Sequence, residues 1–298
     1  MNQNKYRVAQ HLFLVQSPDD HLDIPTYIPS FAPFVSAEEG DVLFTLCANI
    51  AEHHSFKGWD EIGQFDCGGA NHGVYIDADG NYGFEISLPG EGGPLSCTMM
   101  ANPDFTQCEA LIVPGQILQH SQFGLNNAIM MAYAFASATY DTLLVHASVI
   151  RNNGYGYLFT APSGTGKSTH THLWYKNIPG CDLMNDDNPV VRVIDGKAIV
   201  FGSPWSGKTP CYRNIQAPIG AITRIEQAPY NKVQPMSPIE AFAMLLPAVS
   251  SMKWDRRVYN GVCQAISRLL PVTPIWRLEC LPDADAAHVC YDAIHVKS

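Results

Sequence analysis

Apolar and polar positions alternate along the N-terminal part of the chain. The alternation covers residues 6–16, 42–50 and 73–88. A period of two places successive side chains on opposite faces of an extended segment, so each stretch predicts a half-buried strand. We therefore expect residues 1–124 to form a β-rich N-terminal region.

An acidic, glycine-containing break divides the third stretch. Residues 77–81, Asp-Ala-Asp-Gly-Asn, have the composition of a hairpin turn. A calcium-binding loop of the EF-hand type is the alternative, and it needs glycine at its sixth position and glutamate at its twelfth. Those positions hold Tyr82 and Leu88. We therefore expect a turn.

Beyond residue 125 the pattern changes to helical spacing mixed with short strands. Small and apolar residues without proline predict a helix over residues 125–140, and β-branched runs predict strands over 142–150 and 155–160. Strands that alternate with helices predict an α/β region over residues 125–298. Its further strands are expected at 182–185, 190–194, 198–201, 217–227 and 275–280, and its further helices at 166–176, 237–246, 253–270 and from 284.

Composition narrows the class of protein. Of the 298 residues 46% are hydrophobic and 15% are charged, which is typical of a globular chain. A net charge of −10 without any block of Lys and Arg argues against nucleic acid or an anionic membrane as the partner. The nine cysteines show no C-x-x-C spacing, which indicates reduced thiols. With no signal-peptide core and no apolar span of about 20 residues, we expect a cytoplasmic protein.

One glycine-rich segment has the composition of a phosphate-binding loop. It follows the form G-x-x-x-x-G-K-[ST], with alanine at the first glycine position. Glycines permit backbone angles at which N–H groups converge on phosphate oxygens, and a helix that begins there adds its positive dipole end. The segment lies between a predicted strand and a predicted helix, as this chemistry requires. The candidate nucleotide-binding residues are Ala161, Pro162, Ser163, Gly164, Thr165, Gly166, Lys167, Ser168 and Thr169.

Four side chains in and after this segment predict a site for ATP and Mg²⁺. The Lys167 ammonium can reach the β- and γ-phosphates, and the Ser168 hydroxyl can ligate Mg²⁺. A phosphate-bound Mg²⁺ also takes a carboxylate, and Asp186 and Asp187 follow a short predicted strand. One carboxylate can bind the metal, and the other can accept the proton of an attacking hydroxyl.

The histidines are less specific. His146 lies on the apolar strand before the loop, where a lone histidine is more commonly a buried structural residue. His170 and His172 are two residues apart on a predicted helix and point in different directions, which disfavours a metal site. His53 and His54 have no partner at ligand spacing. From the residues alone, all five are expected to be structural or surface groups.

Several segments together resemble a known family. His146 with its following Ala-Ser, the turn at 152–154, the loop at 161–169 and the Asn-Asp-Asp sequence at 185–187 are similar to the catalytic domain of HPr kinase/phosphorylase and its relatives. The resemblance covers residues 143–227. It implies an α/β fold with a phosphoenolpyruvate carboxykinase-like P-loop core and a mixed β-sheet, preceded here by the β-rich N-terminal region.

The resemblance also implies roles for individual residues. Lys167 and Ser168 would hold the triphosphate and Mg²⁺, and Asp187 would be a further metal ligand. Asp186, oriented by His146, would be the general base toward a hydroxyl acceptor. These assignments make Asp186, His146 and Lys167 the expected catalytic residues.

Other features leave the acceptor open. Lys208 and Arg213, in and after the sequence Gly-Ser-Pro-Trp-Ser-Gly-Lys at 202–208, would contact phosphate by the same resemblance, with ordinary surface charges as the alternative. The chain lacks the glycine-rich acceptor loop of the true enzymes, and residues 1–140 do not resemble their regulatory domain. The acceptor is therefore a small molecule, a peptide or a protein serine.

Three functions remain in competition. The leading hypothesis is an ATP- and Mg²⁺-dependent kinase that phosphorylates a hydroxyl group. A nucleotide-binding regulatory protein without catalysis and a phosphoenolpyruvate carboxykinase-like decarboxylating phosphotransferase are the alternatives. A GTPase is disfavoured because residues 231–234, Asn-Lys-Val-Gln, lack the aspartate of a guanine-reading N-K-x-D sequence. An oligomer is compatible with each of these functions.

Overall fold

The structure is a computed structural model that describes residues 2–18, 22–67, 70–90, 92–207 and 209–296. It divides into two compact units. Unit 1 comprises Met1–Ser137 and Met252–Arg256, and unit 2 comprises Ala138–Ser251 and Arg257–Ser298. The chain is α/β, with a mixed sheet in each unit.

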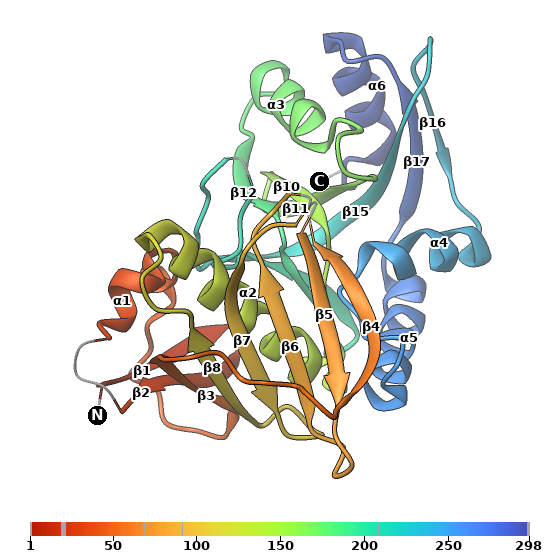
Figure 1. Cartoon of the computed structure of the whole chain (residues 1–298). Coiled ribbons are helices and arrows are strands. Elements are labelled where there is room, and N and C mark those ends of the chain that lie inside the picture. The colour runs from red at the N-terminus through yellow and green to blue at the C-terminus, as the bar shows by residue number, and fades with distance from the viewer. Residues whose placement is uncertain (1, 19–21, 68–69, 91, 208, 297–298) are drawn as a thin grey trace. The chain divides into compact units, whose positions relative to one another are not determined.

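Unit 1 is built on a sheet with the strand order β1-β2-β3-β8-β7-β6-β5-β4 (Figure 1). β2 and β8 run parallel to β3, and the other neighbours are antiparallel. Buried and less buried positions alternate along β3, as its sequence pattern predicts. The elements are β1 (Asn2–Val8), β2 (His11–Ser17), α1 (Ile24–Tyr27), η1 (Pro29–Phe34), β3 (Val42–Ile50), β4 (Asp60–Cys67), β5 (Ala70–Ile76), β6 (Tyr82–Ser87), β7 (Leu95–Ala101), β8 (Gln107–Ile112) and α2 (Leu118–Ser137).

The predicted strand over residues 6–16 is two strands. β1 and β2 form an antiparallel hairpin in which Val8 pairs with His11. Ala9 and Gln10 have positive φ angles of 47° and 70°, which suits a tight two-residue turn. The apolar alternation continues through this turn, so the pattern alone did not reveal the break.

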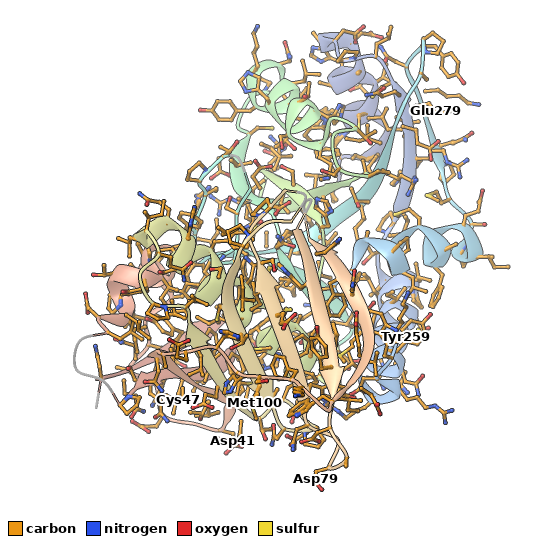
Figure 2. The ribbon with its side chains drawn as sticks, in the orientation of Figure 1. Asp41, Cys47, Asp79, Met100, Tyr259 and Glu279 are labelled. Carbon is orange, nitrogen blue, oxygen red and sulfur yellow. The ribbon has the colours of Figure 1, made fainter. Side chains whose placement is uncertain are left out.

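The turn predicted at residues 77–81 is confirmed. It joins β5 to β6, and Asp77 Oδ1 accepts hydrogen bonds from the N–H groups of Asp79 (2.9 Å) and Asn81 (2.8 Å). Gly80 has a φ of 85°, which glycine adopts without strain. Asp79 lies at the tip of the turn (Figure 2). The Asp77 carboxylate therefore closes the turn.

The helix predicted over residues 125–140 is α2, which begins and ends earlier than expected. It packs on β3, β6, β7 and β8, and it buries Leu125, Ile129 and Tyr133. The predicted domain boundary between residues 124 and 125 falls inside this helix. The compact units divide after Ser137 instead, because the length of α2 is part of the packing of unit 1.

Unit 2 is built on a second mixed sheet with the order β12-β10-β11-β15-β14-β13-β9, and β17 pairs with β15 and β16. β11, β15 and β17 are parallel neighbours. Both β11 and β12 are antiparallel to β10, so they point the same way. The strands are β9 (Thr142–Leu144), β10 (Ala147–Asn152), β11 (Tyr155–Thr160), β12 (Asp182–Asp187), β13 (Val190–Ile194), β14 (Lys197–Phe201), β15 (Gln216–Gln227), β16 (Lys232–Pro235) and β17 (Ile275–Cys280).

The β-branched run at residues 142–150, predicted as one strand, is divided between β9 and β10. The backbone leaves the strand at Val145 and His146, whose N–H groups donate to Pro189 O (3.0 Å) and Ala248 O (2.7 Å). These partners lie far away in the sequence, so the local pattern contained no sign of the break. The division places His146 at an interruption of the sheet.

The helices of unit 2 cover the sheet near the ends of its parallel strands. α3 (Lys167–Asn177) and α6 (Ala284–Ile294) lie side by side (Figure 1). Between them and the sheet is a core that includes Phe159, Trp174, Ile225, Leu278 and Cys290. The remaining helices are α4 (Pro238–Leu245), η2 (Leu246–Ala248), α5 (Arg256–Leu269) and η3 (Leu270–Val272).

Two expectations from composition concern the cysteines and membrane-spanning helices. The cysteines whose side chains are described are free thiols, as the absence of C-x-x-C spacing predicts. In the described ranges of the chain, no helix combines the length and apolar character needed to cross a bilayer.

Candidate phosphate-binding site

The glycine-rich segment forms a curled loop between β11 and α3. Gly164 and Gly166 have φ angles of 79° and 116°, a region that favours glycine, and Gly166 caps the start of α3. The Thr165 N–H donates to Pro162 O at 3.2 Å, which closes a turn inside the loop. Strand, curled loop and helix therefore follow one another in the order that a phosphate-binding loop requires.

Lys167 spans this loop. Its ammonium donates to Ala161 O at 3.0 Å. Burial lowers the pKa of Lys167, while the nearby carboxylates of Asp187 and Asp186 act in the opposite direction. The charged amine is thus held at the mouth of the loop, next to the acid pair that the sequence predicted beside it.

Asp186 lies directly against the loop. Its Oδ1 accepts a hydrogen bond from Ser168 Oγ at 2.9 Å, and its Oδ2 accepts one from the Thr209 N–H at 3.3 Å. The residue is only 4% exposed. A hydroxyl and a carboxylate oxygen at this distance are the ligand types that Mg²⁺ takes beside a bound phosphate.

Asp187 and His146 form a second, more open pair. His146 Nε2 lies 3.2 Å from Asp187 Oδ1, and the two side chains are 41% and 36% exposed. The other oxygen of Asp187 accepts from Asn188 Nδ2 at 2.7 Å. The resemblance implied that His146 orients Asp186, and this expectation is corrected. The histidine contacts Asp187, because the break between β9 and β10 places it beside the last residue of β12.

The backbone of Asp187 is strained. Its φ is 143°, a value that an L-residue with a side chain rarely adopts. A neighbouring segment holds it there, since Asp187 forms an isolated bridge with Ser206 and the Gly207 N–H donates to Asp186 O. A Cβ at Gly207 would lie 3.2 Å from Asp187 Cβ, so glycine allows this close approach. The sequence did not identify Ser206, Gly207 or Thr209 as neighbours of the acid pair.

Arg213 and Lys208 are the two residues predicted to contact phosphate, and the structure describes only Arg213. Arg213 donates to Asp182 Oδ2 at 2.7 Å and to Leu183 O, and Arg151 binds the same aspartate through two hydrogen bonds. These bonds keep Arg213 at the start of β12, and its contact with a γ-phosphate stays a prediction. Lys208 lies outside the described residues.

Two cavities flank the N-terminal end of α3. One, of about 540 Å³, includes Gly164, Gly166 and Thr169 together with residues at the ends of β15 and β17. The other, of about 400 Å³, includes Ser168 and Asp186 and extends along α3 toward Asp182. The loop therefore has open volume on both sides, in the range expected for small-ligand sites.

His170 is the most buried of the histidines near the loop. It is 2% exposed, lines the 540 Å³ cavity and accepts a hydrogen bond from Trp174 Nε1 at 3.1 Å. Burial lowers the pKa of His170 to about 4. The expectation that it is structural agrees with this packing, although its place in the cavity wall was not foreseen.

Similarity of this chain to known proteins is found among solved structures and not in sequence. No protein-family model and no curated protein matches the chain. Among solved structures, the chain is similar to the HPr(Ser) kinase/phosphatase from Coxiella burnetii, with a TM-score of 0.28 and 10% identity, over 49% of this chain and 90% of that one. The chemistry of the site has to be read from its own residues.

Proposed function

We propose that the chain is an ATP- and Mg²⁺-dependent kinase that transfers the γ-phosphate of ATP to a hydroxyl acceptor. One observation carries the proposal. The Ser168 hydroxyl at the start of α3 donates to Asp186 at 2.9 Å, directly after a curled glycine loop that Lys167 spans. A helix start, an ammonium and a metal-type oxygen pair thus meet within a few residues, as phosphoryl transfer requires.

The residues present fit both nucleotide and metal. The N–H groups of the loop and the Lys167 ammonium supply donors for phosphate oxygens. Ser168 Oγ and the Asp186 carboxylate supply oxygen ligands for Mg²⁺, which prefers few protein ligands beside the phosphates. When bound, Mg²⁺ neutralises the charge that develops on the phosphates.

The geometry supports different roles for the two aspartates, one as a metal ligand and the other as the general base. Asp186 is buried against Ser168 and suits the metal side, whereas Asp187 is exposed enough to meet an acceptor. Asp187 accepts the proton of the attacking hydroxyl, and His146 holds its carboxylate through Oδ1. This assignment exchanges the two roles that the resemblance implied for the aspartates.

A direct transfer assay tests the proposal. Purified protein is incubated with Mg²⁺ and ATP labelled at the γ-position, together with a panel of alcohols, hydroxy acids, peptides and protein serines. Transfer of label to a hydroxyl is expected. ATP binding without transfer to any acceptor would favour a regulatory nucleotide-binding protein, and oxaloacetate-dependent nucleotide consumption would favour a carboxykinase.

Matched substitutions test which carboxylate is the base. Asp187→Asn is expected to lower kcat by about 10²–10⁴-fold, the usual contribution of a general base, with little change in the Mg²⁺ requirement. Asp186→Asn is expected to raise the Mg²⁺ concentration needed for half-maximal rate. If Asp186→Asn lowers kcat at saturating Mg²⁺ while Asp187→Asn shifts the metal requirement, the roles implied by the resemblance are the correct ones.

A further inference from the structure

The 540 Å³ cavity begins where the phosphate loop ends. It is lined by Gly164, Thr165 and Gly166 of the loop and by Thr169 of α3. From there it extends to the ends of β15 and β17, the parallel neighbours of β11. In sheets of this kind ligands bind beyond the carboxyl ends of the strands. A ligand whose phosphates lie in the loop therefore has this volume next to it.

Beyond the loop the lining of the cavity is largely apolar, with Gln227 as a polar member. Leu173, Ile225, Pro229, Cys280 and Leu281 contribute to its wall. Such side chains suit the faces of an aromatic ring, whereas a further phosphate group beside them would lose part of its hydration. The cavity thus joins the glycines of the loop to a largely apolar wall.

His170 adds a buried hydrogen-bond donor to this wall. Its Nε2 accepts from the indole N–H of Trp174, and an indole nitrogen can only donate. The Cys290 thiol also lies near this N–H, but sulfur is the weaker acceptor. The imidazole is therefore neutral with its proton on Nδ1. In the described part of the chain Nδ1–H has no hydrogen-bond partner, and the residue is 2% exposed.

An unsatisfied buried donor is unfavourable unless a ligand completes it, with a penalty of about 1–3 kcal/mol. Nucleobases present ring nitrogens and carbonyl oxygens that accept such a bond, together with flat apolar faces. Oxygens of pyrophosphate and longer inorganic polyphosphates also accept hydrogen bonds, but these ions have no flat apolar face to lie against the apolar wall. The cavity therefore distinguishes a nucleotide from an inorganic phosphate donor.

We propose that this cavity binds the base of a nucleoside triphosphate and that His170 Nδ1–H donates a hydrogen bond to an acceptor atom of that base. The inference rests on the proposed function, since it requires the triphosphate to occupy the loop. It adds where the base of that nucleotide lies and which residue recognises it, and it thereby excludes inorganic polyphosphate as an equivalent donor.

Calorimetric titration of the full chain with two probes tests the inference. ATP and inorganic tripolyphosphate, each with Mg²⁺, are compared at pH 7.5. Both ligands are expected to bind, with ATP at least tenfold tighter. Equal dissociation constants would overturn the base site while leaving the phosphate loop intact. Failure of both ligands to bind would overturn the proposed function itself.

Two variants then assign the difference to the cavity. His170→Phe keeps a ring of similar size without the donor, and it is expected to weaken ATP binding about five- to tenfold, as for one lost hydrogen bond. Leu281→Trp fills the cavity from a side chain that is 38% exposed, so the fold tolerates it, and a loss of at least tenfold is expected. Neither variant is expected to alter tripolyphosphate binding.

His288→Phe, at an exposed position of α6 outside the cavity wall, is the matched control and is expected to bind ATP like the unmodified chain. The inference is overturned if the His170 and Leu281 variants keep full ATP affinity, or if they weaken ATP and tripolyphosphate equally. The Leu281 variant keeps the test decisive should His170→Phe disturb the packing of Trp174.

Discussion

A glycine-containing loop follows a strand in each unit, and the two loops differ in what surrounds them. In unit 1 the turn at residues 77–81 is closed by its own first residue, since both oxygens of Asp77 accept bonds from within the turn. In unit 2 the loop at residues 161–166 is bordered by groups from elsewhere. Lys167 reaches back over it, and Asp186 and Asp187 come from another strand.

The comparison shows how a structural loop differs from a binding loop. Both loops contain glycine, but the acidic residues belong to the turn itself in unit 1 and come from β12 in unit 2. In the turn the Asp77 carboxylate is hydrogen-bonded within the turn, which leaves it little capacity for a ligand. Beside the loop at residues 161–166 an ammonium and two carboxylates lie close together, and their remaining bonding capacity is what the proposed phosphate and metal would use.

Outside the acid pair, the largest effect is expected from Lys167→Met. Loss of the ammonium removes a charge aimed at the transferring phosphate, and removal of such a group typically lowers kcat by about 10²–10³-fold. Because burial already disfavours the charged amine, the free energy of unfolding is not expected to fall. Steady-state kinetics and urea unfolding measure the two quantities. Lys57→Met, at an exposed position in unit 1, serves as the control and leaves both unchanged. Equal loss of activity in both variants would remove the distinction between the loops.

A moderate effect is expected from pH, through His170. Burial lowers its pKa from 6.5 to about 4, so the unfolded chain binds a proton there that the folded chain does not. Stability linked to this group is complete above pH 6.5 and decreases as the pH falls toward 4. Between pH 7.5 and pH 5 the loss amounts to about 2 kcal/mol.

Urea unfolding without nucleotide or Mg²⁺ at the two pH values measures this loss. His170→Phe, which cannot be protonated, is expected to reduce the pH dependence by that amount. An unchanged slope in the variant would show that other groups cause the acid sensitivity of unit 2.

A smaller effect is expected at the strained residue of the acid pair. Asp187→Gly relieves a φ of 143° and is expected to raise the free energy of unfolding by about 1 kcal/mol, while its kcat falls as in Asp187→Asn. Asp187→Ala removes the same carboxylate without relieving the backbone, so it is expected to be less stable than the glycine variant. Thermal unfolding and the transfer assay check both points. Equal stability of the two variants would mean that the backbone stores no strain there.

The smallest effect is expected in the turn of unit 1. Hydrogen bonds from Asn81 hold the pKa of Asp77 below its ordinary 3.8, so the carboxylate stabilises the fold above that pH and the contribution fades as the pH falls through the lower value. Asp77→Ala is expected to lower Tm by about 1–2 °C at pH 7 and to leave nucleotide affinity unchanged. Altered ATP binding in this variant would contradict the view that the turn is only structural.

Much of the secondary structure follows from local pattern. The strands near residues 42–50, 155–160 and 275–280 agree with β3, β11 and β17, because alternation or a β-branched run and a nearby breaker coincide there. The predicted strand boundaries are wrong where a break depends on residues far away in the sequence or where the apolar pattern continues through a turn. The β1–β2 turn continues the apolar alternation, and the break at His146 depends on bonds to Pro189 and Ala248. The compact units divide after Ser137 and not at the expected 124/125, because the buried side chains of α2, which a sequence does not show, pack within unit 1.

The sequence by itself determined which chemical groups the site contains. Glycines, Lys167, Ser168 and the two aspartates are recognisable because the loop needs particular backbone freedom, and its order between strand and helix is local. The tertiary structure alone decided which partner each group has. Asp186 faces Ser168, Asp187 faces His146, and His170 enters a cavity wall between β15, β17 and α3. These pairings depend on strand register and on a break in the sheet, which arise from contacts between residues far apart in the chain.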